Sequence, residues 1–219
     1  MFKTINQEPM KRRDFVKTLP ILVATPLLLV SSQAKPVMRH LVVLGSAATN
    51  LVVKYGSKMT FDSYTVANDM KPDGCAVNFD FFPFFKPDTS DLILEEFRNQ
   101  KPENLPFLEL SDDLKSTIEG KSGTITVLAA LGNFTGTLLF QALGTQLDIK
   151  RADLRMVGTL PFFFEGSKRQ ENALTAIRNL KVNPSQTIFP LDQIRQIYGN
   201  LSIRSAFEKA DELILDALI

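Results

Sequence analysis

Two apolar strands, each followed by an unusual loop, constrain the fold of this chain more than any other feature. The first covers residues 124–131 and leads into Gly-Asn-Phe-Thr-Gly-Thr at 132–137, and the second covers 155–160 and leads into 161–169. A continuous apolar strand needs cover on both faces, which is typical of a parallel sheet between helix layers. Ligands of such sheets bind at the carboxyl ends of the strands. The sequence therefore predicts that any small-molecule site lies at these two loops.

Strands and helices alternate along the rest of the chain. The last helix is marked by apolar residues at spacings of three and four, from Ile203 to Ala217, as expected for a helix laid across a core. Alternating units predict a three-layer α/β domain with a Rossmann-like parallel sheet. The other expected strands are at 38–44, 64–67 and 186–189. A loop is expected at 45–50, followed by a short helix to Tyr55. Further helices are expected at 91–98, after Ser111 as N-cap, from about Gly166, and around Ile194 and Ile197.

Composition excludes several classes of function. The chain has 219 residues, of which 44% are hydrophobic, enough for one domain with a continuous core. A net charge of +1, with no basic block beyond the N-terminus, argues against a nucleic-acid partner. Cys75 is the one cysteine and His40 the one histidine, so the sequence offers neither a disulfide framework nor a zinc-binding cluster.

Residues 1–34 have the pattern of an export signal. Charged residues at 11–17 precede an apolar run at 18–30 and small residues up to Ala34. The segment resembles a twin-arginine signal, which has an arginine pair, a phenylalanine and a lysine at the positions of Arg12, Arg13, Phe15 and Lys17. We expect cleavage after Ala34 and export of a domain at 35–219 to the periplasm. The alternatives are an ordinary secretory signal, or an uncleaved segment that anchors the domain to a membrane.

Five phenylalanines lie among prolines in the middle of the chain, at Phe79, Phe81, Phe82, Phe84 and Phe85. Such a cluster can form an exposed surface for a partner. It can also pack locally against the core under a long loop. We favour the second interpretation.

Three motifs, in this order along the chain, resemble the nucleotide-binding domain of the FtsZ/tubulin superfamily, and FtsZ most of all. Residues 132–137 are similar to the signature Gly-Gly-Gly-Thr-Gly-Thr-Gly. Residues 159–169, Thr-Leu-Pro-Phe-Phe-Phe-Glu-Gly-Ser-Lys-Arg, resemble the family's Thr-Lys-Pro-Phe-Asn-Phe-Glu-Gly-Lys-Lys-Arg. Residues 206–213 are similar to the start of the family's central helix. The resemblance runs from about His40 to Ile219.

The resemblance implies a site for GTP or GDP, with Mg²⁺ accompanying GTP. It assigns the phosphates to the signature loop and the first glycine-rich loop, the ribose to the second motif, and the base to the last helix. The residues implied for the phosphates are Gly132, Thr135, Gly136 and Thr137 in the signature loop and Gly45 and Asn50 in the first loop. Those implied for the ribose are Glu165 and Arg169. Those implied for the base are Phe207 and Glu212, and Asp211 is adjacent to Glu212.

This sequence departs from the family pattern at the phosphate loops. Non-glycine residues occupy 46–49 in the first loop, and Asn133, Phe134 and Leu138 replace glycines of the signature. Each added Cβ crowds the close backbone approach that a phosphate needs. Leu191 replaces an asparagine that recognises guanine in the family. We therefore expect GTP binding to be degenerate.

The family's acidic catalytic loop and second domain, which follow the central helix, have no counterpart in the printed sequence. We accordingly predict no catalytic residue and no protein metal ligand, and expect neither hydrolysis nor family-type polymerisation. Two hypotheses remain open. One is a divergent FtsZ-like guanine-nucleotide-binding domain. The other is an exported pseudo-GTPase that acts without nucleotide as a binding or scaffold module, through a protein partner or self-association.

Overall fold

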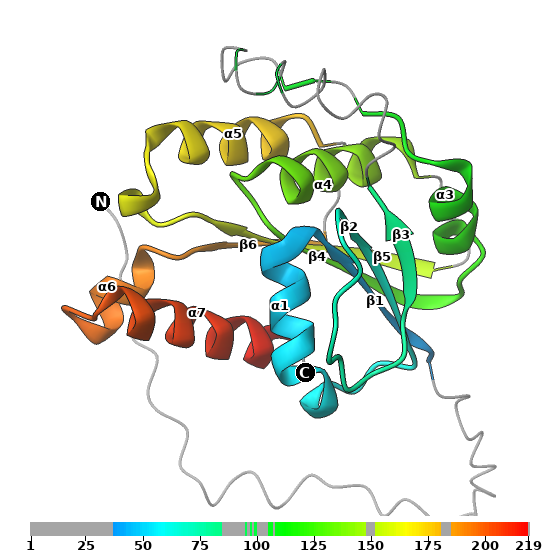
Figure 1. Cartoon of the computed structure of the whole chain (residues 1–219), viewed down its shortest axis with the longest axis horizontal. Helices are drawn as coiled ribbons and strands as arrows, with labels where there is room; N and C mark the ends of the chain where they lie inside the picture. Colours follow the sequence, from blue (N-terminus) through cyan, green and yellow to red (C-terminus); the bar gives the residue numbers. More distant parts are fainter. Residues whose placement is uncertain are drawn as a thin grey trace, which may run out of the picture. The chain divides into compact units, whose positions relative to one another are not determined.

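The computed structural model describes residues 37–84, 95, 97, 99, 105–106, 108–147, 152–180 and 185–218 (Figure 1). The expected signal at 1–34, most of the expected helix at 91–98, and Phe85 lie outside the described residues.

Six parallel strands form one sheet in the order β3-β2-β1-β4-β5-β6 (Figure 1). Leu44 at the end of β1 pairs with Ala129, and Thr159 pairs with Ala130, so the carboxyl ends of three central strands are level. This confirms the predicted parallel α/β fold. The strands are β1 (Arg39–Leu44), β2 (Ser63–Asn68), β3 (Asp80–Pro83), β4 (Gly123–Ala130), β5 (Ala152–Leu160) and β6 (Gln186–Pro190).

Helices cover both faces of the sheet and complete the three layers. Helices α3, α4 and α5 lie on one face, and α1 and α7 lie on the other (Figure 1). The helices are α1 (Gly45–Tyr55), α3 (Asp112–Glu119), α4 (Phe134–Gln146), α5 (Ser167–Arg178), α6 (Gln193–Tyr198) and α7 (Ile203–Leu218), with 3₁₀ turns η1 (Gly56–Lys58) and η2 (Phe163–Glu165).

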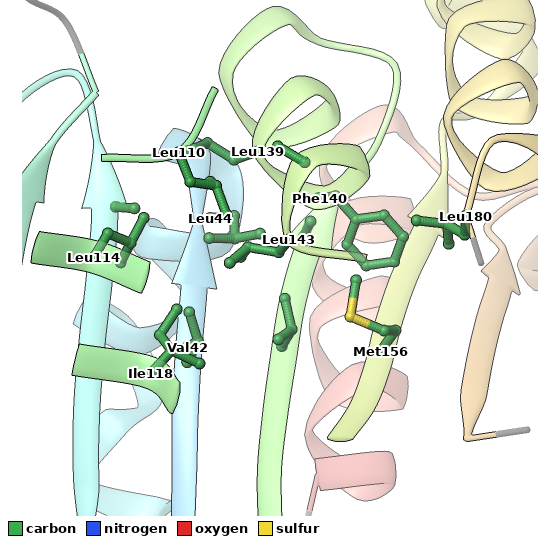
Figure 2. Close-up of a cluster of buried hydrophobic side chains, with 14 of the residues drawn as sticks. Val42, Leu44, Leu110, Leu114, Ile118, Leu139, Phe140, Leu143, Met156 and Leu180 are labelled. Atoms are coloured by element: carbon green, nitrogen blue, oxygen red, sulfur yellow. The ribbon is translucent and has the colours of Figure 1, made fainter. Parts of the chain in front are cut away.

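Strand β1 shows why the central strands are apolar throughout. Val42 and Leu44 face the core under α3 and α4, where Phe140 and Leu143 are fully buried (Figure 2). Leu41 and Val43 face the core under α1 and α7. Successive side chains of a strand point to opposite faces, so a strand covered on both sides needs no polar face.

Helix α1 begins at Gly45, directly after β1, whereas the sequence pattern predicted a loop over 45–50. That prediction was wrong because Ala47 and Ala48 are good helix formers and only the first residue needs a special conformation. Gly45 has φ +77°, which a glycine adopts without strain. The helix therefore starts at the residue that directly follows β1.

The phenylalanine-rich segment contains the edge strand β3. Phe81 and Phe79 pack against one core, and Phe82 and Phe84 pack against the other. This supports the interpretation as core packing for these four rings, although a strand rather than a loop carries two of them.

The predicted N-cap of α3 is confirmed, because the Ser111 side chain accepts a hydrogen bond from the Leu114 amide. Across the described ranges, no helix combines the length and apolarity needed to cross a membrane. Within the same ranges, no three His, Cys, Asp or Glu side chains are grouped as metal ligands would be.

Candidate functional site

The N-terminal ends of α1 and α4 meet at the carboxyl edge of β1 and β4. A Cβ at Gly45 would lie 2.7 Å from the Gly136 nitrogen, and one at Gly136 would lie 2.9 Å from the Ala130 oxygen. The N-cap residues Leu44 and Asn133 make no side-chain capping hydrogen bond. The positive ends of two helix dipoles therefore converge without a side-chain cap, an arrangement suited to an anion.

The signature loop is fixed by its own polar groups. The Gly132 amide donates to Thr137 Oγ1 at 2.8 Å, and Thr137 is fully buried. Gly132 has φ +101°, and a Cβ there would lie 2.8 Å from the Arg169 carbonyl oxygen. The Thr137 hydroxyl thus orients the loop, and the start of α5 closes over Gly132.

Asp69 is a further residue at this edge, which the sequence interpretation did not assign to the site. Thr135 Oγ1 donates to its Oδ1 at 2.7 Å. The position of Asp69 just after β2 was the available signal, because β2 neighbours β1 in the sheet. Without the strand order, nothing placed this carboxylate next to α4.

A pocket lies beside the two helix ends, with an empty space of about 610 Å³ that includes the part open to solvent. Its walls come from α1, the ends of β4 and β5, η2, and α7. Most of them are apolar, and the polar side chains are those of Asn133, Thr159, Glu165 and Asp211. The remaining lining residues are Ala47, Ala48, Leu51, Leu128, Ala129, Ala130, Leu131, Pro161, Leu191, Phe207, Ala210 and Ile214.

Glu165 lines the pocket and is held in place by two hydrogen bonds. Its Oε1 accepts from the Phe162 amide at 2.9 Å, and its Oε2 accepts from Arg169 Nη1 at 2.8 Å. The structure thus brings together the two residues predicted to contact the ribose. Arg169 does not itself line the pocket but stands behind Glu165.

Phe207 lines the pocket with 40% of its surface exposed. Its ring lies edge-on to the ring of Phe162, with the centroids 5.2 Å apart. Phe164 stacks on Phe162 with the centroids 4.9 Å apart, and it also lies edge-on to Phe207 with the centroids 6.0 Å apart. The aromatic cluster fixes Phe207 and still leaves part of its ring open to a planar ligand.

Asp211, not Glu212, lines the pocket. Asp211 forms an ion pair with Lys54 Nζ at 3.1 Å. Hydrogen bonding to Tyr55 and then to Asp211 raises the pKa of Lys54. Glu212 points away and pairs with Lys209 one helical turn earlier.

The other predicted residues are divided between the helix ends and the surface. Gly45, Gly132, Thr135, Gly136 and Thr137 converge where α1 and α4 begin. Asn50 is exposed in the middle of α1 and does not line the pocket, because helix formation from Gly45 turns it outward.

The chain has the fold of the FtsZ/tubulin nucleotide-binding domain, as its strand order and helix placement show. The solved structure of an empty FtsZ dimer from M. jannaschii superposes with a TM-score of 0.60 at 19% identity, covering 85% of this chain and 54% of that one. CetZ1 from Haloferax volcanii, solved as a GDP-bound monomer, superposes with a TM-score of 0.57 at 17% identity, covering 82% and 58%.

Similarity to a curated protein is found in sequence as well. The chain is 30% identical over 111 residues to the cell division protein FtsZ 1 of Pyrococcus abyssi. The match covers 50% of this chain and 30% of the relative, so the chain spans under a third of that protein's length. No protein-family model matches the chain.

Proposed function

We propose that this chain is a divergent guanine-nucleotide-binding domain of the FtsZ/tubulin superfamily. The observation that carries the proposal is a pocket at the strand ends, bounded on one side by two helix N-termini without side-chain caps and on the other by Phe207 and Glu165. The P. abyssi relative and the GDP-bound CetZ1 structure support it.

The nucleoside end of a guanine nucleotide fits the pocket chemically. The open part of the Phe207 ring offers a stacking surface, and apolar side chains such as Leu51 and Leu191 surround it. Glu165 already accepts two hydrogen bonds, and a carboxylate with two oxygens retains capacity to accept one from a ribose hydroxyl. Asp211 is placed to accept from the N–H groups of a purine edge.

The phosphate end fits less well. Backbone amides at the start of α4, around Thr135 and Gly136, would hold a phosphate by the helix-end effect. However, the methyl groups of Ala47 and Ala48 and the side chain of Asn133 line this part of the pocket, where the family motifs have glycines. Mg²⁺ bound to the phosphates would neutralise their charge. We therefore propose that this chain binds guanine nucleotides with lower affinity than a site that keeps the family's glycines.

Calorimetry on the full chain tests the proposal directly. We expect heat of binding for GDP and GTP, with Mg²⁺ present, and much less for ATP. Equal binding of ATP would contradict the assignment of a guanine site. The absence of heat with GDP and GTP at high micromolar concentration would favour the second function below.

The second function is that of a pseudo-GTPase, an exported binding or scaffold module without nucleotide. It is favoured by apolar side chains that are exposed on η2, α6 and α7. Phe163, Ile197 and Ile203 are 74%, 64% and 62% exposed. An apolar surface of this kind is typical of sites that contact a partner.

We also propose export through a twin-arginine signal, on the residues Arg12, Arg13, Phe15 and Lys17. A reporter fused after Ala34 should reach the periplasm with the natural signal. It should remain in the cytoplasm when Arg12→Lys and Arg13→Lys are combined. Export unaffected by the double substitution would refute the twin-arginine assignment.

A further inference from the structure

A cluster of three polar side chains lies at the amino ends of β1, β2 and β4, away from the pocket at their carboxyl ends. Ser63 is the first residue of β2, and it is the register partner of His40 in β1. Lys121 belongs to the turn between α3 and β4, where its amide donates to the Ile118 carbonyl oxygen at 3.1 Å. The three residues are distant from one another in the chain, so no local sequence motif marks the cluster.

The hydrogen bonds of His40 determine which ring nitrogen can act as a base. Its Nε2 lies 2.9 Å from the Ser122 carbonyl oxygen, and its Nδ1 lies 2.7 Å from Ser63 Oγ. Because a carbonyl oxygen only accepts, Nε2 carries the hydrogen of the neutral ring. Nδ1 therefore has the lone pair and accepts the hydroxyl hydrogen of Ser63. His40 is 7% exposed, so water has little access to either bond.

The turn that carries Ser122 is held against the start of β1. The Thr124 amide donates to the Met38 carbonyl oxygen at 2.8 Å. Gly123 has φ +102°, and a Cβ there would collide with the same carbonyl group. The Ser122 carbonyl is therefore a fixed acceptor for His40. A nucleophile bonded to a base, with the base oriented by a third group, is the arrangement that activates a serine in covalent catalysis.

Lys121 gives the Ser63 hydroxyl a second hydrogen bond. Its Nζ donates to Ser63 Oγ at 3.1 Å, and the hydroxyl oxygen accepts, because an ammonium group has no lone pair. A positive charge beside an oxygen favours its deprotonated form. The hydroxyl of Ser63 thus has a base at its hydrogen and a cation at its oxygen.

We propose that Ser63 is a nucleophilic serine that takes the acyl group of an activated carboxylic ester, with His40 as its base. Ser63 is partly exposed, so the start of β2 is open to a small reagent from solvent. The proposal does not rest on guanine-nucleotide binding, because the cluster and the pocket lie at opposite ends of the strands.

The acylation step balances with the groups present and the ester. Ser63 Oγ forms a bond to the carbonyl carbon of the ester, and its proton passes to His40 Nδ1. The bond from that carbon to the leaving alcohol then breaks, and the leaving oxygen takes the proton from His40. The products are an acyl-serine and a free alcohol.

The test incubates the full chain with p-nitrophenyl acetate and locates the acetyl group by peptide mass spectrometry. Ser116 is the matched control, because its side chain is exposed and its hydroxyl donates to the Asp113 carbonyl oxygen instead of to a base. We expect rapid acetylation of Ser63, little acetylation of Ser116, and loss of the rapid reaction in Ser63→Ala but not in Ser116→Ala.

Two further variants test the roles of the neighbours, and circular dichroism establishes that each is folded. His40→Gln should slow the acetylation of Ser63 about a hundredfold, the lower range of general-base catalysis. Lys121→Met keeps most of the side chain and removes its charge, and should slow the reaction about five- to tenfold. Since His40 is buried, Lys121→Met and the location of the acetyl group decide the matter if His40→Gln does not fold.

The proposal is overturned if acetyl groups appear only on lysines, or on Ser116 as fast as on Ser63. It is also overturned if Ser63 reacts at an unchanged rate in the folded neighbour variants.

Discussion

At the scale of single residues, Gly45 and Gly136 determine how closely α1 and α4 approach each other. The atoms that a Cβ at Gly136 would meet are backbone oxygens, those of Ala130 at 2.9 Å and Leu44 at 3.2 Å. Backbone at the end of a central strand cannot move away as a side chain can. The contact therefore depends on glycine for steric reasons, whether or not a ligand binds.

The substitution Gly136→Ala should destabilise the protein by about 1–3 kcal/mol, because overpacking against backbone forces the helix off the strand end. Gly144→Ala is the matched control in the same helix. There the Cβ meets the flexible end of Leu180, at 2.3 Å from Cδ2, and the gain in helix propensity offsets part of the crowding. Urea unfolding of the two variants measures the difference, and equal free energies of unfolding would contradict this steric account.

The neighbouring carboxylates Asp211 and Glu212 allow a second residue-scale prediction. Asp211→Asn should lower the affinity for GDP about tenfold or more, because hydrogen bonds to a charged group are worth roughly 1.5–3 kcal/mol. Glu212→Gln should leave it unchanged, because Glu212 faces solvent and Lys209. Calorimetry on both variants checks the assignment, and the reverse order of effects would transfer the base contact to Glu212.

At the scale of elements, α7 contributes both to the core and to the pocket, which it lines with Phe207, Ala210, Asp211 and Ile214. Ile214, Leu215 and Leu218 pack against β1 and α1, and Phe207 and Asp211 face the pocket. The helix spans 16 residues, so one element connects the stability of the sheet to the geometry of the site. Loss of core contacts at its C-terminal half should therefore affect stability and ligand affinity together.

Two isoleucines of α7 separate core packing from helix propensity. Ile214→Ala should destabilise the protein by about 2–5 kcal/mol, since it removes a buried side chain that packs between the core and the pocket. Ile203→Ala makes the same chemical change at a position that is 62% exposed, and should change stability little. Denaturant unfolding gives both values, and a similar loss for the two would mean that α7 does not pack as described.

At the scale of the whole molecule, the pocket lies at the carboxyl ends of the strands, and the hydrogen bonds of a buried histidine lie toward their amino ends. The carboxyl edge carries the pocket and the helix ends. Toward the other edge, His40 lies buried between Ser63 Oγ at 2.7 Å and the Ser122 carbonyl oxygen at 2.9 Å, linking β1 to β2 and to the approach to β4. Ligand binding at one edge should stabilise the whole domain, because the same strands form both edges.

Bound GDP should therefore raise the melting temperature of the full chain. A ligand at a hundred times its Kd adds about 2.7 kcal/mol to the free energy of unfolding. For a chain of this size, that corresponds to an increase of roughly 5–11 °C. Thermal unfolding followed by circular dichroism, with ATP at the same concentration as the control, measures the shift; an equal shift with ATP would show that the stabilisation is not specific for guanine.

Much of the fold follows from patterns that are local in the sequence. The apolar strands at 124–131 and 155–160 predicted a covered parallel sheet, and Ser111 predicted the start of α3. The sequence did not predict strand β3 or the start of α1 at Gly45. Strand β3 depends on pairing with β2, and the start of α1 depends on its close approach to α4, so both depend on partners that are distant in the chain.

The sequence by itself determined the α/β layering and the loops at which a ligand site should lie, because apolar continuity and turn residues act over a few positions. Only the tertiary structure decided that Asp69 lies at the start of α4, 66 positions away in sequence, that Asp211 faces the pocket while Glu212 does not, and that Asn50 faces away. These placements depend on strand order, helix rotation and the first residue of a helix. Each of them is fixed by packing between distant segments, and no single stretch of sequence contains that information.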